Sequence, residues 1–242
     1  MPLSAEAFGR KINQLLDELW PYALDYYHPL IDGRVKTRDD LAEWFSKFYI
    51  KDVGVILART YAKCPHLDAR GFIAENLWEE EGKGEAGRSH AELSMRLPRY
   101  FGVSDADLEA FHQKWLASPQ SQGREELVQK ETWIEEFAGF GLGSEHYAPA
   151  FFTLILERLR GEFEIPEEAL EFFLVHLYED VDHARRTMEI VLRYATTDEE
   201  QESVLAAIRR HILGEAGLMG GDRTPMPLAP EIVDALRSAA GR

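Results

Sequence analysis

The chain has one cysteine, Cys64, among its 242 residues. A single cysteine excludes an internal disulfide and is typical of proteins of a reducing compartment. The sequence also lacks an apolar run of the ~20 residues that a membrane-spanning helix needs. Its first residues, MPLSAEAFGRKINQLL, lack the apolar core of a signal peptide. We therefore expect a cytoplasmic protein without a membrane span.

Basic residues are few compared with acidic ones. The chain carries 27 lysines and arginines against 43 aspartates and glutamates, which gives a formal net charge of −16. Nucleic acids and anionic membranes are bound by positively charged surfaces, so neither is expected as a partner. Hydrophobic residues make up 45% of the chain. That fraction is ordinary for a globular protein, and the length allows a sizeable core.

Strand patterns and internal repeats are also missing, whereas apolar residues recur at helical spacing along nearly the whole chain. Thr37 with Asp40 and Thr197 with Glu200 resemble helix-capping boxes. Helices are predicted at about 5–26, 37–62, 68–81, 118–140, 144–160, 166–195, 198–216 and 230–239, with short helices from 89 and 104. The sequence thus predicts one all-α domain over residues 1–242, a bundle of seven to nine helices, in which 217–242 form a loop-rich C-terminal arm.

The segment HLYEDVDHARR, residues 176–186, carries an unusual set of polar residues. His176, Asp180 and His183 are spaced i, i+4 and i+7, so they form one stripe along a helix. Their neighbours, including Phe172 and Phe173, are apolar, and a helix of this kind is largely buried. Buried ionisable groups must be paired or bound to a metal. The stripe is therefore either a metal site or a structural His–Asp hydrogen-bond pair.

A metal site needs ligands from further helices, and three other segments offer them. Glu79, Glu80 and Glu81 end one expected helix, and His90 follows a Gly-rich break. Glu145 opens the expected helix 144–160, whose following residues are strongly apolar. Each segment has an ordinary alternative, because a glutamate run is usually solvated and a glutamate at a helix start compensates the dipole. Together the six candidates supply three carboxylates and three imidazoles: Glu80, His90, Glu145, His176, Asp180 and His183.

This mixed oxygen and nitrogen set suits two irons or manganeses better than zinc, which prefers four ligands and often thiolate. A ferritin-type centre requires two Glu-x-x-His pairs on separate helices, and the chain does not have two. Asp180-x-x-His183 is a related i, i+3 pair. Of the other five histidines, His66, His112 and His211 have polar neighbours and are predicted at the surface.

The order of these segments, NLWEEEG…SH, then GSEHYAP, then HLYEDVDHARR, resembles the haem-oxygenase-like di-iron oxidases. That family shares its fold with the TenA, PqqC and CADD-type proteins, and the resemblance covers about residues 20–195. It implies a haem-oxygenase-like helical bundle, a homodimer and a centre of two irons, or of manganese and iron, with O2 as co-substrate. The implied metal ligands are the six candidates above. The choice of Glu80 over Glu79 or Glu81 rests on the resemblance alone.

The activity that the resemblance implies is the O2-dependent oxidation of a small carboxylic or amino acid, by desaturation, C–C cleavage or N-oxygenation. CADD-type proteins form p-aminobenzoate from a tyrosine of their own, with the help of a lysine. The matching positions here hold Ile31 and Ile155, so we expect a separate small-molecule substrate, although Tyr26 and Tyr27 lie nearby. Two alternatives stay open: a metal-independent enzyme of the TenA or PqqC type, and a non-catalytic partner-binding protein of the same fold.

A substrate pocket is expected beside the ligands. Apolar residues one or two turns away are predicted to line it, namely Phe151, Phe152, Phe172, Phe173, Trp78 and Trp44. Arg88 or Arg185 is the predicted partner of a substrate carboxylate.

Overall fold

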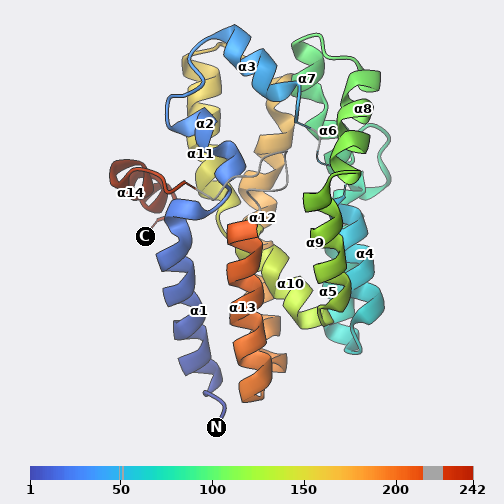
Figure 1. Cartoon of the computed structure of the whole chain (residues 1–242), viewed down its shortest axis with the longest axis vertical. Helices are drawn as coiled ribbons and strands as arrows, with labels where there is room; N and C mark the ends of the chain where they lie inside the picture. The colour runs from blue at the N-terminus through green and yellow to red at the C-terminus, as the bar shows by residue number, and fades with distance from the viewer. Residues whose placement is uncertain (49, 51, 215–225, 242) are drawn as a thin grey trace.

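The computed structural model describes residues 1–48, 50, 52–214 and 226–241 (Figure 1). Within these ranges every regular element is helical, which confirms the all-α prediction. Eleven helices of the described ranges have eight residues or more, against the seven to nine expected. They are α1 (Ala5–Leu19), α3 (Arg38–Phe45), α4 (Val53–Lys63), α5 (Leu67–Glu80), α8 (Asp105–Leu116), α9 (Pro119–Lys130), α10 (Trp133–Phe140), α11 (Ala148–Gly161), α12 (Glu167–Tyr194), α13 (Asp198–Gly214) and α14 (Pro230–Ala239).

Shorter elements join these helices. They are α2 (His28–Ile31), α6 (His90–Ser94) and α7 (Arg96–Tyr100), the 3-10 turns η1 (Trp20–Tyr22), η2 (Asp25–Tyr27) and η3 (Gly82–Gly84), and the π-helix η4 (Gly141–Glu145). Residues 217–225 of the expected C-terminal arm lie outside the described ranges. The final helix predicted at 230–239 is present as α14.

Three expected helices are shorter than predicted because local signals end them. The helix predicted over 5–26 ends at Leu19, since Pro21 follows and Leu24 has a left-handed backbone. The helix predicted over 37–62 is divided into α3 and α4, and Phe48, in the connection, is fully buried against Phe173. The helix predicted over 118–140 is divided into α9 and α10, because Thr132 forms a capping box with Glu135 and starts a new helix.

The longest helix, α12, lies at the centre of the bundle. It packs against α1, α6, α7, α10, α11 and η4, so segments far apart in the sequence meet along it (Figure 1). Its N-terminal part is buried through Phe172 and Phe173, and its middle carries Asp180 and His183, both 3% exposed. The predicted metal-ligand stripe therefore lies in the middle of the molecule.

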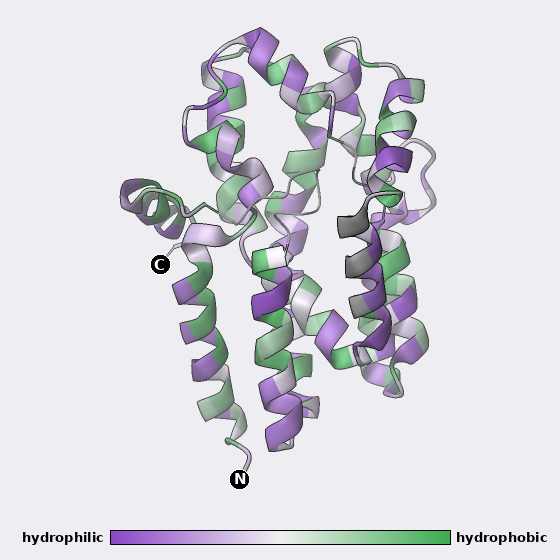
Figure 2. Ribbon diagram, in the orientation of Figure 1, coloured by the Kyte–Doolittle hydropathy of each residue, from purple (hydrophilic) through white to green (hydrophobic). Residues whose placement is uncertain are grey.

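Apolar packing explains how the outer helix α1 is held on the bundle. In α1 the buried residues Phe8, Ile12, Leu15 and Leu19 recur at helical spacing, and Figure 2 shows hydrophobic and hydrophilic residues on opposite sides of this helix. In the part of the chain that is described, no helix combines the length and apolarity that crossing a membrane requires.

Candidate metal centre

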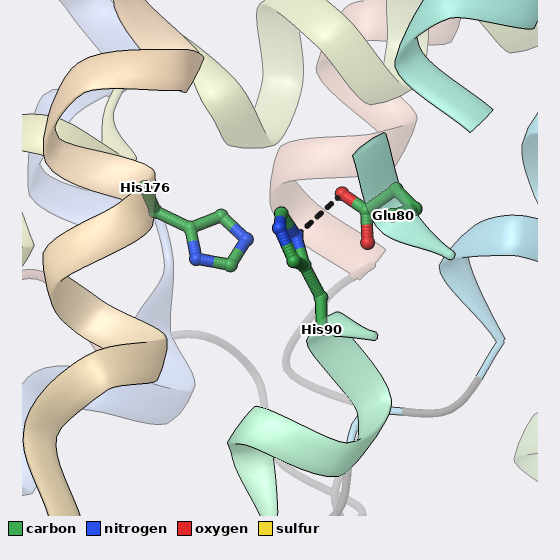
Figure 3. A group of neighbouring side chains, drawn as sticks. All are labelled: Glu80, His90 and His176. Atoms are coloured by element: carbon green, nitrogen blue, oxygen red, sulfur yellow. Dashed lines mark ion pairs between the residues drawn. The ribbon is translucent and has the colours of Figure 1, made fainter. Parts of the chain in front are cut away.

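The first group of candidate ligands, called the first triad below, comes from three elements. Glu80 is the last residue of α5, His90 is the first of α6, and His176 lies in α12; Figure 3 shows their side chains facing one another. Nδ1 of His90 is 3.1 Å from Oε1 of Glu80, and one potential ligand atom from each residue lies within 4.8 Å of the other two. Glu80 is buried, whereas Glu81 is exposed. Burial thus distinguishes Glu80 from Glu81.

The second group, called the second triad, consists of Glu145, Asp180 and His183. One potential ligand atom from each lies within 4.8 Å of the others, and all three side chains are buried. Nδ1 of His183 is 3.4 Å from Oε1 of Glu145 and 3.8 Å from Oδ1 of Asp180. Asn76 of α5 donates a hydrogen bond of 3.3 Å to the same Glu145 oxygen. The six predicted residues are therefore brought together as two adjoining triads.

The π-helix η4 places Glu145. The sequence predicted a helix start at 144, but α11 begins at Ala148, and residues 141–145 extend α10 as a π-turn. A Cβ on Gly141 would lie 2.5 Å from Oγ1 of Thr187 in α12, and one on Gly143 would lie 2.7 Å from the His211 ring in α13. These two glycines let the turn approach both helices, and π-turns often occur at functional sites. Glu145 is thus not the dipole-compensating residue of α11.

Burial and charge shift the pKa values of Asp180, His183 and His176. Burial, together with repulsion from the Glu145 and Glu80 carboxylates, raises the pKa of Asp180 well above its usual range. Burial opposes protonation of His183, but Glu145 and Glu79 outweigh it and raise the pKa of His183 to about 9. Burial and the neighbouring His90 lower the pKa of His176 to about 4. Both raised pKa values favour the protonated forms of Asp180 and His183, which reduces the buried negative charge.

The outer nitrogens of two histidines face carboxylates that sequence reasoning did not assign. Nε2 of His183 forms a 2.8 Å hydrogen bond with Oε2 of Glu79, and Nε2 of His90 is 3.3 Å from Oε2 of Glu179. Burial lowers the pKa of His90, but Glu179 and Glu80 outweigh it and raise that pKa to about 10. Glu179 sits three residues after His176 on α12, so the helical spacing carried a signal for it.

The atoms that face into the triads fit a bound metal. Three of these atoms are buried and have no hydrogen-bond partner among the described residues: Nδ1 of His90, Nδ1 of His183 and Oε2 of Glu145. Nδ1 of His176 is 2.6 Å from the carbonyl oxygen of Phe172, so this nitrogen donates and Nε2 is left for the triad. Buried polar atoms without partners are costly, and a divalent cation would satisfy them. The first triad has two histidines and one carboxylate, a set typical of non-haem iron.

A cavity of about 190 Å³ adjoins both triads. Of the predicted pocket residues, Phe152 and Phe172 line it, next to Tyr27, Ile50 and Ala148. Phe151 and Phe173 are instead fully buried in the core, and Trp78 is 57% exposed. Neither Arg88 nor Arg185 lines this cavity; Arg88 pairs with Glu171 and Arg185 with Asp182 and Glu189.

Two histidines predicted at the surface also line this cavity. His112 is 5% exposed, with Nε2 at 3.5 Å from Oδ1 of Asp52. The ring of His211 is 2.8 Å from Oγ of Ser144. The surface prediction was based on their polar sequence neighbours. Tertiary packing, which the neighbours do not reveal, turns these sides of α8 and α13 toward the cavity. A second cavity of about 780 Å³ shares several lining residues with the first, among them Asp52, Trp115 and His211.

A helical bundle whose core holds His and carboxylate side chains from facing helices is the arrangement of iron- and manganese-binding bundle proteins. Comparison with known proteins agrees with this class. The sequence profile of a family described as iron-containing redox enzymes matches residues 43–216, and the chain belongs to that family.

Two similar proteins add to this assignment. A 4-aminobenzoate synthase from Nitrosomonas europaea is 23% identical over 229 residues, which cover 86% of this chain and 87% of that protein. A crystal structure of a domain of unknown function with a haem-oxygenase-like fold, from Shewanella denitrificans, matches with a TM-score of 0.61 at 15% identity. It covers 98% of this chain and 93% of that one. The fold is therefore haem-oxygenase-like, as the sequence resemblance implied.

Proposed function

We propose that this protein is an O2-dependent non-haem di-iron oxidase that acts on a small carboxylic or amino acid. The observation that carries the proposal is the pair of buried triads, which gather six ligand-type side chains. Among the described residues, no hydrogen-bond partner is available to Nδ1 of His90, Nδ1 of His183 or Oε2 of Glu145. Glu80, His90 and His176 would hold one metal ion, and Glu145, Asp180 and His183 the other. Two bound irons would supply the activation of O2, for which protein side chains have no equivalent.

The cavity favours a small substrate with an apolar body. Its volume of about 190 Å³ is below the ~300–1,000 Å³ of typical ligand pockets. Phe152 and Phe172 would hold the apolar part of the substrate and exclude water from the triads. No lysine or arginine lines this cavity in the described part of the chain, so the counter-charge for a substrate carboxylate would come from the metal ions. The adjoining larger cavity offers an entry route past Asp52 and His211.

Anaerobic titration with Fe(II) tests the proposal. Wild type is expected to bind two irons per chain and to develop O2-dependent visible absorption on stopped-flow mixing. His176→Ala should disable the first triad and Asp180→Ala the second, so that each variant retains one ion. Lys47→Met is a control, because Lys47 pairs with Glu43 on the surface away from both triads. Absence of specific iron binding by wild type would overturn the proposal.

A second candidate function, formation of 4-aminobenzoate, is favoured by one observation. Tyr26 and Tyr27 line the cavity beside both triads, and one similar protein is a 4-aminobenzoate synthase. Against it, Ile155 is fully buried in the core, and no lysine among the described residues lines the cavity. Peptide mass analysis before and after reaction with O2 separates the two candidates. An altered Tyr26 or Tyr27 would favour the second, and unaltered tyrosines with O2 consumed only when substrate is added would favour the first.

The remaining alternatives predict different metal behaviour. A metal-independent enzyme of the TenA type would rely on a cysteine, but Cys64 is buried and does not line the cavity. A non-catalytic binding protein would not need two complete triads. We also propose a homodimer in the reducing cytoplasm, which light scattering of the purified protein and cell fractionation would test.

A further inference from the structure

A chain of polar contacts connects the two triads through one lysine outside them. Nζ of Lys83 is 3.1 Å from Oε1 of Glu79 and 3.0 Å from Oε1 of Glu179. The second oxygen of each glutamate faces a histidine, since Oε2 of Glu79 is 2.8 Å from Nε2 of His183 and Oε2 of Glu179 is 3.3 Å from Nε2 of His90. Each carboxylate therefore bridges the same lysine to a different triad.

The two histidines use their ring nitrogens in the same way. Nδ1 of His90 faces Glu80 at 3.1 Å, and Nδ1 of His183 faces Glu145 at 3.4 Å. The outer nitrogen of a ligating histidine usually donates to a carboxylate, which fixes the tautomer and the ring orientation. Glu179 and Glu79 occupy that outer position for His90 and His183, and Lys83 holds both carboxylates.

Lys83 occupies a backbone position that disfavours a side chain. Lys83 has φ 55° and ψ 26°, between Gly82 at φ 76° and Gly84 at φ 82°. A left-handed backbone disfavours residues with a Cβ, so glycine or asparagine would suit this position better. Strained backbone of this kind persists where the surrounding structure enforces it, and it is frequent at functional sites. Here the position between two glycines lets the lysine reach both α5 and α12.

We propose that Lys83 is a positioning residue that couples the two metal sites, by orienting His183 through Glu79 and His90 through Glu179. This inference rests on the proposed di-iron function. It predicts that one substitution outside both triads weakens metal binding in both of them. It also predicts that Glu79→Gln weakens the second triad alone and Glu179→Gln the first alone.

The test measures Co(II) dissociation constants by visible absorption, at each triad separately. Asp180→Ala protein reports on the first triad and His176→Ala protein on the second. In both backgrounds Lys83→Met is expected to weaken Co(II) binding about tenfold, at the lower end of the 10–100-fold effects of outer-shell partners. Lys83→Arg should restore binding, because it retains the charge and the donors. Lys47→Met is the matched control, a surface lysine of similar exposure that pairs with Glu43.

Thermal unfolding of the metal-free proteins separates positioning from stability. Lys83→Gly removes the side chain and relieves the left-handed strain, so it is expected to keep the unfolding temperature while binding Co(II) about tenfold more weakly. Unchanged binding in the Lys83 variants, or weakening in one background alone, would overturn the inference and leave the metal centre intact. Failure of wild type to bind two ions would overturn the di-iron function together with it.

Discussion

The two triads differ in how the chain holds their residues. Glu145, Asp180 and His183 lie on η4 and α12, two helical elements that pack directly against each other. Glu80 and His90 lie at either end of the 81–89 connection, and His176 is the first triad's one residue inside a long helix. The second triad is therefore fixed by helix packing, whereas the first depends on the conformation of a connection.

Glycines show the same contrast. Gly82, in the connection, has φ 76°, and a Cβ there would lie 2.5 Å from the backbone nitrogen of Ser89. Gly141, in η4, has a helical backbone, and its Cβ would meet the side chain of Thr187. The Thr187 side chain can adjust to a Cβ on Gly141 or be substituted. The Ser89 backbone cannot make room for a Cβ on Gly82 without shifting the adjacent His90. The first triad should therefore be the more sensitive to changes in its supporting glycine.

Gly82→Ala should have the largest effect. The left-handed backbone costs about 1–2 kcal/mol for a residue with a Cβ, and overlap with the Ser89 backbone adds a similar amount. We expect the free energy of unfolding to fall by about 3 kcal/mol, and Co(II) binding to be lost in the first triad and kept in the second. Chemical denaturation and Co(II) titration measure the two effects.

Gly87→Ala is the matched control for that substitution. Gly87 lies in the same connection with φ 78°, but nothing is within 4 Å of its Cβ position. It should show only the backbone cost, ~1 kcal/mol, and should keep both metal ions. Equal effects at the two glycines would mean that the contact with Ser89 does not shape the first triad.

The pH dependence of metal uptake should be the next largest effect. The pKa of His90 is about 10 and that of His183 about 9 in the metal-free protein, so both are protonated at neutral pH and a metal must displace their protons. Raising the pH removes this competition, so affinity rises about tenfold per pH unit for each proton displaced, or ~2.7 kcal/mol per proton between pH 6 and 8.

The pH profiles should also separate the triads. Burial raises the pKa of Asp180 as well, so a metal at the second triad also competes with protonation of this carboxyl, and we expect a steeper pH dependence there. The contribution of His183 ends above about pH 9, and that of His90 above about pH 10. Calorimetric titration in buffers of different ionisation enthalpy counts the protons in the Asp180→Ala and His176→Ala backgrounds. Affinities that do not change with pH would contradict the protonation states described here.

Gly141→Ala should act mainly on the second triad. Its Cβ would lie 2.5 Å from Oγ1 and 2.9 Å from Cγ2 of Thr187, and overpacking of this kind costs ~1–3 kcal/mol. We expect a loss of about 2 kcal/mol in unfolding free energy and weaker Co(II) binding beside Glu145. Thr187→Ala in the same protein should recover part of both losses, because it removes the two nearest atoms. Additive effects of the two substitutions in a double-mutant cycle would exclude this contact as the cause.

Ser89→Ala should have the smallest effect. Ser89 caps α6, and its Oγ accepts a 3.2 Å hydrogen bond from the backbone nitrogen of Glu92. Loss of such a cap costs ~1 kcal/mol, and the start of α6 carries His90, so first-triad binding should weaken slightly. Ser104→Ala removes an equivalent cap from α8, where Oγ accepts from Asp107 at 3.2 Å. The control should show the same loss of stability with unchanged metal binding; an effect of Ser104→Ala on metal would point to global destabilisation.

The sequence was most informative where local periodicity decided the structure. His176, Asp180 and His183 could be predicted because their i, i+4, i+7 spacing belongs to one helix, and the all-α class followed from the same periodicity. Glu80 could be chosen from its run of three only through a family resemblance, since helical spacing does not separate adjacent residues. The breaks before Val53 and Trp133 were missed, because the buried Phe48 and the capping box at Thr132 outweigh continuous helical patterns.

The parts that could not be predicted depend on contacts between distant segments. Lys83 and Glu179 are 96 residues apart, and nothing local to either residue indicates their ion pair. His112 and His211 line the cavity because α8 and α13 turn them toward it, a choice that polar neighbours in the sequence obscure. The family resemblance covered the six candidate ligands, and these outer residues lay beyond it.

The direction in which the Glu145 side chain points depends on the number of residues in the π-turn Gly141–Glu145. An α-helix advances about 100° around its axis with each residue, so one residue more or fewer rotates everything that follows by that angle. The wider turn accommodates an additional residue between α10 and Glu145 without breaking the helix. Deleting one of the residues 141–144 would restore ordinary helical phase and turn the carboxylate away from α12, although the deletion would leave Glu145 itself in place.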